Sequence, residues 1–235
     1  MTRYQAVLFD LDGTLVSEVD GVERATDLVA AALRERGHEV DGGALNAARA
    51  EVVRSAMADN RGTWPEWLTR VEWMRRTFRQ VSAPEDLAPE LAAVYLAGRL
   101  DGLALIDHAV ELVEAVQREA PSMGLITNGD GREQRAKLAR VGLDRFFPNP
   151  LISAELGTQK PKPAIFEQAL AAVGAKAGET VYIGNSYGND VEGAAGVGMD
   201  TVWLDQAGSG SPAGAAVEPT CTASTLREVR AFLGV

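Results

Sequence analysis

Two carboxylates close together near the start of the chain are the first residues that could perform chemistry. Asp10 and Asp12 follow an apolar run, AVLF at residues 6–9, and Gly13 lets the chain turn sharply beyond them. One carboxylate could act as a nucleophile and the other as a proton donor or acceptor. A plainer interpretation is a solvated Asp-Gly turn after a buried strand. Polar groups at the ends of other strands decide between the two interpretations.

Six further polar residues are predicted at the edges of later strands and helices. They are Thr127, Asn128, Lys160, Asn185, Asn189 and Asp190. Singly, each has an ordinary structural interpretation as a turn residue, a helix N-cap or a solvated lysine. Because the carboxyl ends of parallel strands share one edge of a sheet, where ligands bind, these groups can converge on the Asp pair. Together they match the needs of phosphoryl transfer: a carboxylate nucleophile, oxygen ligands for a divalent cation, and donors for the phosphoryl oxygens.

Short buried strands alternate with helices in most of the chain. We predict strands at residues 4–10, 122–126, 151–153, 180–183 and 201–204. Helices are predicted at residues 109–118, 133–141, 164–173, 190–197 and 224–233. This alternation indicates βαβ units, and therefore an α/β fold with a Rossmann-like, doubly wound parallel sheet.

The segment at residues 17–98 follows a different pattern, with apolar residues every three or four positions and no strand. Helices are predicted at residues 22–33, 44–57, 64–81 and 84–96. The segment therefore predicts an α-helical bundle inserted directly after the Asp pair, as a cap domain over the carboxyl edge of the sheet. Residues 1–16 and 99–235 would form the α/β core, which is the catalytic domain. Trp64, Trp67 and Trp73 are interpreted as part of the cap's apolar core rather than as a substrate box.

Composition excludes several classes of function. With 235 residues, 46% of them hydrophobic, the chain can bury a sizeable core. Its net charge of −10 disfavours nucleic-acid binding, which relies on Lys and Arg at the phosphates. One Cys and two His cannot supply a zinc cluster, and they supply a Ser-His-Asp triad poorly. The sequence contains no apolar run of 18 residues, so we predict no membrane span. The first residues lack the apolar core of a signal peptide, and we therefore expect a cytoplasmic protein.

The motifs and their order resemble those of the haloacid dehalogenase-like (HAD) hydrolase superfamily. DLDGT at residues 10–14, TNG at 127–129, Lys160 in QKPKPAIF, and GNSYGNDVEGA at 184–194 resemble its four motifs. TNG alone is a weak signal, whereas four motifs in order at the expected strand or helix edges are a strong one. The position of the helical insertion is similar to that of the family's small helical (C1-type) cap.

The resemblance implies a role for each matching residue. Asp10 would be the nucleophile, and Asp12 the acid and base that protonates the leaving alcohol and then activates water. Thr127 and Lys160 would hold the phosphoryl group, with Asn128 beside them in the phosphate-binding site.

The resemblance also implies a Mg²⁺ site formed by Asp10, the backbone carbonyl of Asp12, and the fourth motif. That motif usually opens Gly-Asp, whereas this chain has Gly184-Asn185. Asn185 can ligate a cation through its carbonyl oxygen, but without charge. We therefore expect Asp190 to carry more of the metal binding, and the affinity for Mg²⁺ to be modest.

Two features narrow the activity that the resemblance implies. Dehalogenases of the family have no acid at the position of Asp12, and phosphonate-cleaving members use a cap lysine, whereas residues 17–98 contain no lysine. We expect a Mg²⁺-dependent phosphatase that acts on a small phosphorylated metabolite, such as a sugar phosphate or nucleotide, through an aspartyl-phosphate. The protein would be a monomer or homodimer. Two alternatives stay open: a sugar phosphomutase, and a non-catalytic binding module because of Asn185.

Overall fold

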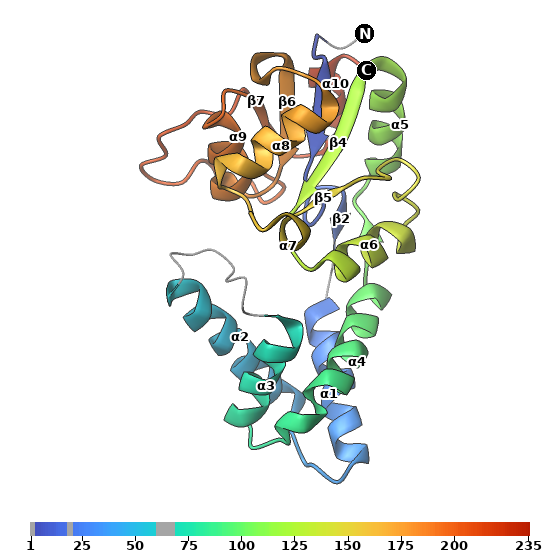
Figure 1. Ribbon diagram of the computed structural model, residues 1–235, viewed down its shortest axis with the longest axis vertical. Coiled ribbons are helices and arrows are strands. Elements are labelled where there is room, and N and C mark those ends of the chain that lie inside the picture. Colours follow the sequence, from blue (N-terminus) through green and yellow to red (C-terminus); the bar gives the residue numbers. More distant parts are fainter. Residues whose placement is uncertain (1–2, 18–20, 60–68) are drawn as a thin grey trace. The chain divides into compact units, whose positions relative to one another are not determined.

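A six-stranded parallel sheet carries the Asp pair (Figure 1). The computed structural model describes residues 3–17, 21–59 and 69–235. The sheet order is β5-β4-β1-β6-β7-β8, so β1 lies between two parallel neighbours. The strands are β1 (Ala6–Phe9), β4 (Ser122–Thr127), β5 (Leu151–Ile152), β6 (Thr180–Gly184), β7 (Asp200–Leu204) and β8 (Cys221–Ala223). All four residues of β1 are buried, because a strand covered on both faces needs an uninterrupted apolar run.

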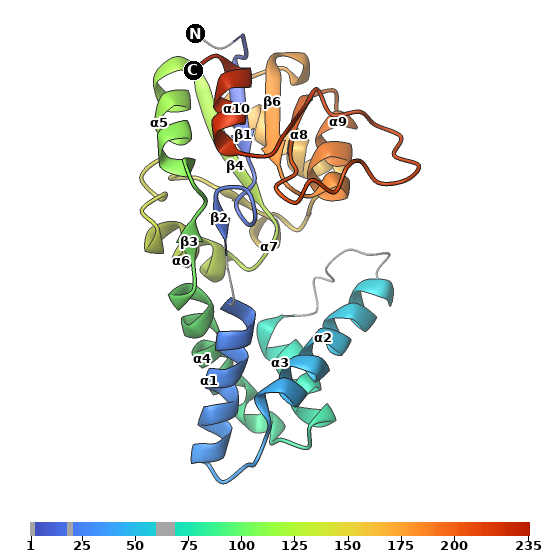
Figure 2. The same ribbon diagram turned by 180° about the vertical axis from the view of Figure 1, so that it is seen from behind.

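Helices cover both faces of this sheet. The helices α8 (Pro163–Val173) and α9 (Gly193–Ala195) lie in front of it in Figure 1. The opposite view in Figure 2 brings α5 (Ala109–Glu119) and α10 (Leu226–Leu233) to the front. This arrangement confirms the predicted Rossmann-like, doubly wound α/β fold.

The remaining helical segments of this part of the chain connect the strands. They are α6 (Gly131–Arg140), α7 (Ser153–Leu156), a 3₁₀ turn (Ala177–Glu179) and a π-helical turn (Tyr187–Glu192). The π-helical turn and α9 replace the single helix that we predicted over residues 190–197. The side chain of Ser186 caps this turn by accepting a hydrogen bond from the Asn189 amide, so helical structure begins three residues earlier than expected.

Three short strands were not predicted. β8 has three residues and lies at the sheet edge, so it is too short to show a periodic apolar pattern. β2 (Val16–Ser17) and β3 (Ala104–Leu105) pair antiparallel, with Ser17 opposite Ala104. The helical insertion therefore leaves and rejoins the α/β part of the chain at two adjacent strands.

The insertion forms a helical unit with its own core. It contains α1 (Gly21–Glu35), α2 (Gly42–Asp59), α3 (Arg70–Gln80), a 3₁₀ turn (Glu85–Leu87) and α4 (Ala88–Asp101). Apolar residues of all four helices bury one another, among them Val29, Leu33, Val52, Phe78 and Leu91. Trp73 belongs to this core and meets the ring of Tyr95 edge-on at 5.0 Å, whereas Trp64 and Trp67 lie outside the described residues.

The start of α3 differs from the helix that we predicted over residues 64–81. α3 begins at Arg70, where the side chain of Thr69 accepts a hydrogen bond from the Glu72 amide at 3.2 Å. Thr69, whose own backbone is extended, is thus the N-cap of α3. The expected positions 64–68 lie outside the described residues.

Packing divides the chain into an α/β unit, residues 1–17 and 104–235, and a helical unit, residues 18–103. The helical unit extends beyond residue 98 because α4 continues to Asp101. The roles of catalytic core for residues 1–16 and 99–235 and of cap for residues 17–98 stay predictions.

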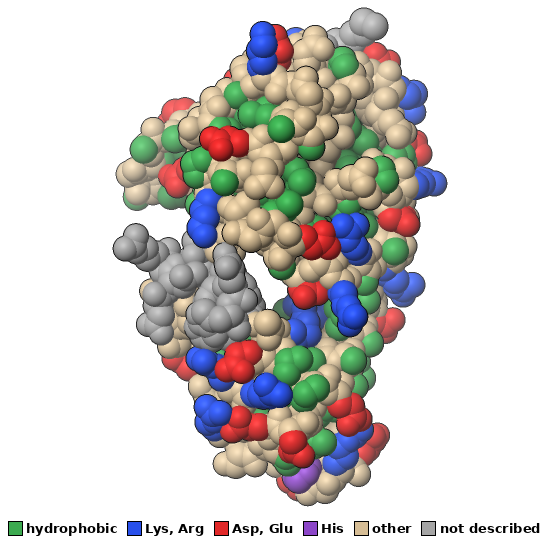
Figure 3. All heavy atoms as spheres, in the orientation of Figure 1, with side chains coloured by type: hydrophobic (Ala, Val, Ile, Leu, Met, Phe, Trp, Pro, Cys, Tyr) green, Lys and Arg blue, Asp and Glu red, His purple; other side chains and the backbone are tan. Residues whose placement is uncertain are grey.

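Charged side chains of both signs are interspersed over the visible face of the described residues (Figure 3). No broad basic area, of the kind that nucleic-acid phosphates would require, covers that face. None of the described helices combines the length and apolar composition that a membrane span needs.

Gly98 tests the packing of the helical unit. A Cβ at this buried position in α4 would lie 2.7 Å from the backbone Cα of Ala25 in α1. We expect Gly98→Ala to lower the free energy of unfolding by about 1–2 kcal/mol, because overpacking outweighs the better helix propensity of Ala. The measurement is urea unfolding followed by circular dichroism.

Ala97→Gly provides the calibration, since Ala97 lies on the exposed face of the same helix. It should cost about 1 kcal/mol from propensity alone. If Gly98→Ala instead stabilised the protein by that amount, the close approach of α1 and α4 would be wrong.

Candidate active site

The carboxyl ends of three neighbouring strands bring the predicted residues together. Phe9 at the end of β1 pairs in register with Leu125 of β4 and Ile183 of β6. The backbone N–H of Asp10 continues this register by donating to the Ile183 carbonyl at 2.9 Å. Asp10, Thr127 and Asn185 consequently emerge at one edge of the sheet.

A buried lysine joins two carboxylates at this edge. The Nζ of Lys160 lies 2.6 Å from Asp10 Oδ1 and 2.6 Å from Asp190 Oδ1. It also donates to the hydroxyl of Tyr182 at 3.0 Å. Because Lys160, Asp10 and Asp190 are each at most 5% exposed, little water screens their charges.

The backbone of Lys160 is held by Asn128. The Asn128 amide nitrogen donates to the Lys160 carbonyl at 3.0 Å, and its oxygen accepts from the Lys160 N–H at 2.9 Å. We predicted Asn128 as a phosphate ligand, but its side chain has a different partner in this structure. Its role at phosphate stays a prediction, and the observed bonds position Lys160.

The environment of Asp10 shifts its protonation. Burial raises the pKa of Asp10 from 3.8 to about 7; the charge of Lys160 lowers it, and the charge of Asp190 raises it. For Lys160, burial lowers the pKa, but the neighbouring carboxylates outweigh burial and hold the pKa above its ordinary value. Two carboxyl groups face the single lysine of this cluster. The cluster therefore has capacity for additional positive charge.

Thr14 links Asp10 to another predicted residue, Asn185, which follows β6. The hydroxyl of Thr14 donates a hydrogen bond to Asp10 Oδ2 at 3.0 Å. The same hydroxyl lies 3.5 Å from Asn185 Oδ1, at the limit of a hydrogen bond. Asn185 packs so closely on Gly13 that a Cβ there would lie 2.2 Å from the Asn185 amide nitrogen. Only glycine fits this position, which also has a φ of +80°.

The donor set at this edge suits a hard divalent cation. The side-chain oxygens of Asp10, Asp190 and Asn185 are the ligand types that Mg²⁺ prefers, and Mg²⁺ keeps several waters when bound by few carboxylates. Within the described parts of the chain, no group of three or more His, Cys, Asp and Glu could hold a metal by itself. A Mg²⁺ ion would therefore depend on an amide or backbone oxygen besides the two carboxylates.

The side chain of Asp12 lies beside this cluster and is 37% exposed. Its oxygens accept hydrogen bonds from Gln134 and Lys137 of α6, at 2.7 and 2.8 Å. Gln134 also donates to the hydroxyl of Thr127, which is fully buried.

Sequence reasoning missed Gln134, Lys137, Thr14 and Tyr182. Lys137 could have been found, because the chain has only four lysines and this one occurs ten residues after Thr127 on a predicted helix. Nothing in the spacing distinguishes Tyr182 from a core residue of its strand.

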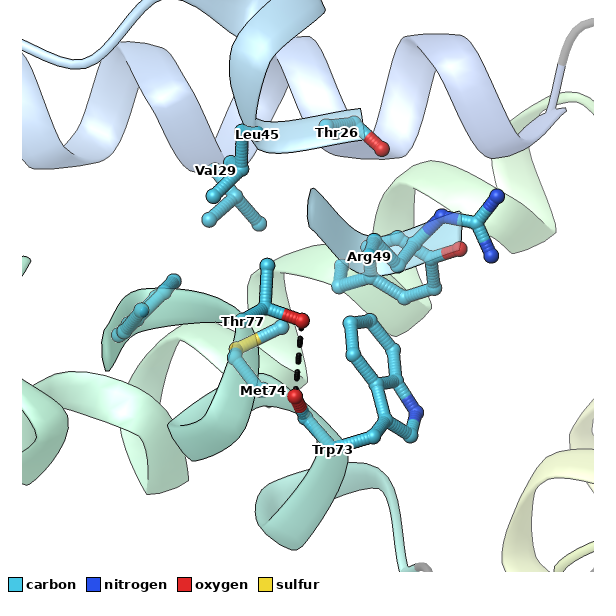
Figure 4. Close-up of a pocket in the computed structure, with 9 residues that line it drawn as sticks. Thr26, Val29, Leu45, Arg49, Trp73, Met74 and Thr77 are labelled. Atoms are coloured by element: carbon cyan, nitrogen blue, oxygen red, sulfur yellow. Dashed lines mark hydrogen bonds between the residues drawn. The ribbon is translucent and has the colours of Figure 1, made fainter. Parts of the chain in front are cut away.

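A small cavity lies elsewhere, inside the helical unit (Figure 4). Its volume is about 10 Å³, room for roughly one water molecule. The walls are mostly buried core side chains, including Val29, Trp73 and Tyr95, and the Thr77 hydroxyl is already bonded to the Trp73 carbonyl at 2.8 Å. It is therefore a packing gap rather than a site for a metabolite.

Comparison with known proteins finds relatives of this chain that are named as phosphatases. The family model described as haloacid dehalogenase-like hydrolase matches residues 4–198. Ribulose-1,5-bisphosphate 5-phosphatase of Halopiger xanaduensis is 31% identical over 209 residues, which are 85% of this chain and 84% of that protein. Glyceraldehyde 3-phosphate phosphatase of Pyrococcus furiosus is 29% identical over 204 residues, 87% of this chain and 82% of that protein.

Solved structures agree with the fold. The crystal structure of the HAD-hydrolase YfnB of Bacillus subtilis bound to magnesium superposes with a TM-score of 0.77. The two chains are 21% identical, and the match covers 99% of this chain and 100% of that one. At this identity the likeness concerns the fold alone.

Lys160→Met tests the buried cluster. Removing the cation leaves Asp10 and Asp190 facing each other without compensation, so we expect the free energy of unfolding to fall by about 3–5 kcal/mol at pH 8. Lys160 lowers the pKa of Asp10, so in the variant this pKa should rise above the wild-type value of about 7. The protonated form of Asp10 favours folding in both proteins, and that benefit is lost as pH rises through the folded-state pKa, at a greater cost to the variant. The loss should therefore be smaller at pH 5 than at pH 8, measured by urea unfolding in EDTA.

Lys162→Met is the matched control, because Lys162 is exposed two residues further along. It should change the unfolding free energy by less than about 0.5 kcal/mol. If both variants lost the same free energy of unfolding at pH 5 and at pH 8, the buried ion pairs of Lys160 would be wrong.

Proposed function

Because the chain belongs to the haloacid dehalogenase-like hydrolase family, we propose that it is a Mg²⁺-dependent phosphatase of small phosphorylated metabolites that acts through an aspartyl-phosphate on Asp10. Asp10 is supplied with what a nucleophilic carboxylate needs. It lies at a strand end, is held by Thr14, and faces the buried cation of Lys160.

In the first step a carboxylate oxygen of Asp10 attacks phosphorus. The new bond joins phosphorus to the Asp10 oxygen, and the bond from phosphorus to the substrate's ester oxygen breaks. Asp12 gives a proton to that departing oxygen, so the product leaves as a neutral alcohol. The exposed side chain of Asp12 supports this role, because a proton donor must reach the substrate.

In the second step water hydrolyses the aspartyl-phosphate. Asp12, now ionised, takes a proton from the water molecule while the oxygen of that water attacks phosphorus. The bond between phosphorus and the Asp10 oxygen breaks, which releases phosphate and restores both carboxyl groups to their starting states.

The remaining residues hold the phosphoryl group and the cation. Thr127 and Lys160 would donate to the phosphoryl oxygens, and Asp190 would keep Lys160 in place. Asp10, Asn185, Asp190 and the Asp12 carbonyl would hold Mg²⁺, which neutralises the negative charge of the phosphoryl group.

The observation that carries this proposal is the pairing of two unlike carboxyl groups two residues apart. Asp10 is buried against a lysine, whereas Asp12 is partly exposed and hydrogen-bonded by α6. Environments that differ in this way divide the tasks of nucleophile and acid between two otherwise similar side chains.

The named relatives support a substrate of the sugar-phosphate class. According to their names, one acts on ribulose-1,5-bisphosphate and the other on glyceraldehyde 3-phosphate. The helical unit, inserted between β2 and β3, would act as the cap that selects among such substrates. A screen over sugar phosphates, nucleotides and phosphorylated amino acids would identify the preferred one.

Asp10→Asn tests the nucleophile. The purified protein should hydrolyse p-nitrophenyl phosphate with Mg²⁺ and lose this activity in EDTA. Asp10→Asn should lower kcat on the order of 10⁴-fold or more, because an amide cannot form the covalent intermediate.

Asp144→Asn makes the same chemical change at an exposed position of the α/β unit and should keep wild-type activity. Mg²⁺-dependent turnover by pure Asp10→Asn protein would contradict the proposed mechanism. Phosphoryl transfer between sugar positions with little free phosphate would indicate a mutase instead.

Asn185→Asp tests the fourth motif. Asp has nearly the shape of Asn, so it can keep the packing on Gly13 while adding a charge at the proposed cation site. We expect the Kd for Mg²⁺ to fall roughly 3- to 10-fold, since one added charge near the surface contributes about 1 kcal/mol. Isothermal titration with Mg²⁺ measures this directly, and an unchanged Kd would show that Asn185 does not ligate the cation.

A further inference from the structure

One face of α6 is directed at Asp12. Gln134 and Lys137 are three residues apart in this helix, a spacing that places them side by side. The helix starts at the N-cap Asp130, whose side chain accepts from the Glu133 amide at 3.1 Å. This cap fixes where the first turn begins, and so which residues point toward the site.

Each of the two residues takes a different oxygen of the Asp12 carboxyl group. Gln134 Nε2 donates to Oδ2 at 2.7 Å, and Lys137 Nζ donates to Oδ1 at 2.8 Å. With both oxygens bonded, rotation of the carboxyl group would break at least one hydrogen bond. Asp12 is therefore held in one orientation although its side chain is 37% exposed.

The burial of these partners is unusual for their types. Gln134 is 1% exposed and Lys137 is 3% exposed. Lys is almost never fully buried unless it is paired, because removing its charge from water is costly. Lys137 forms ion pairs with Asp12 and, at 3.6 Å, with Glu133. An apolar side chain at position 137 would fill the same space without that cost, which points to a use for the lysine beyond packing.

The glycine after Thr127 makes room for this arrangement. A Cβ at Gly129 would lie 3.2 Å from the Gln134 side chain, and the residue has a φ of +142°. The loop that ends β4 can therefore approach α6, and Gln134 reaches the Thr127 hydroxyl as well as Asp12. The side-chain amide of Gln134 thus bonds both Asp12, the proposed acid, and Thr127, the proposed ligand of the phosphoryl group.

We infer that Gln134 and Lys137 are positioning residues that aim the Asp12 carboxyl group at the departing oxygen of the substrate. This inference rests on the proposed phosphatase function. Proton transfer requires the acid within hydrogen-bond reach of its target, and misplacement of a catalytic group by an ångström costs much of its effect. The pair acts on the step that breaks the ester bond, and more strongly as the leaving group becomes poorer.

Leaving-group dependence tests the inference. Dinitrophenyl, p-nitrophenyl and phenyl phosphate have similar shapes, but their leaving groups need progressively more help from an acid. For Lys137→Met and for Gln134→Leu, we expect kcat/KM to be nearly unchanged on dinitrophenyl phosphate and to fall roughly 10- to 100-fold on phenyl phosphate. KM should change little for Lys137→Met, because Lys137 is not assigned to the phosphoryl group, whereas Gln134 also bonds the Thr127 hydroxyl.

Three comparisons make the result decisive. Lys176→Met, at an exposed lysine of the same unit, should match the wild type on every substrate. Asp12→Asn should also lower kcat/KM more on phenyl phosphate than on dinitrophenyl phosphate, and by a larger factor than Lys137→Met does. Adding Lys137→Met to Asp12→Asn should then cause no further loss, because the residue acts through Asp12.

The opposite results are equally clear. An equal fall on all three substrates, with a lowered urea midpoint, would assign Lys137 a structural role and overturn the inference. A rise in KM alone would assign it to substrate binding and also overturn it. If the wild type hydrolysed none of the esters while Mg²⁺ was present, the proposed function itself would fall, and the inference with it.

Discussion

The contact between Lys160 and two buried carboxylates is the interaction on which the α/β unit's site depends. It joins the end of β1, the loop before α8 and the π-helical turn after β6, which are far apart in the chain. None of the three charges could be buried alone without a large desolvation penalty. The neighbouring contacts serve the same cluster: Asn128 holds the Lys160 backbone, Thr14 holds Asp10, and the Ser186 amide donates to Asp190.

Much of the fold was predictable because its signals are local. The apolar run of β1, the strands β4, β6 and β7, and the amphipathic helices each show their period within a few residues. The convergence of Asp10, Thr127 and Lys160 followed from the parallel topology. β8 and the β2–β3 pair were missed, because two or three residues carry no period and are ordered by tertiary pairing.

The residues around Asp12 were harder to predict for a different reason. Gln134 and Lys137 belong to a helix whose sequence is mostly polar, so its buried face cannot be recognised from hydrophobicity. Their burial becomes visible only when α6 is placed against the loop after β1. For Asn128 the motif position suggested phosphate, which stays a prediction, and the structure adds a contact that the sequence did not indicate, between its side-chain amide and the Lys160 backbone.

The antiparallel pairing of β2 with β3 has a consequence for how such a chain could diversify. The chain enters the helical unit after Ser17 and returns at Ala104, and these two residues lie opposite each other. A segment whose two ends are adjacent can be lengthened, shortened or exchanged for another without moving any strand of the main sheet, because domain insertions are tolerated where termini lie close together. The helical unit is in this sense a replaceable module. It is attached where Ser17 pairs with Ala104, whereas the register of the main sheet is set by the pairing of its own strands.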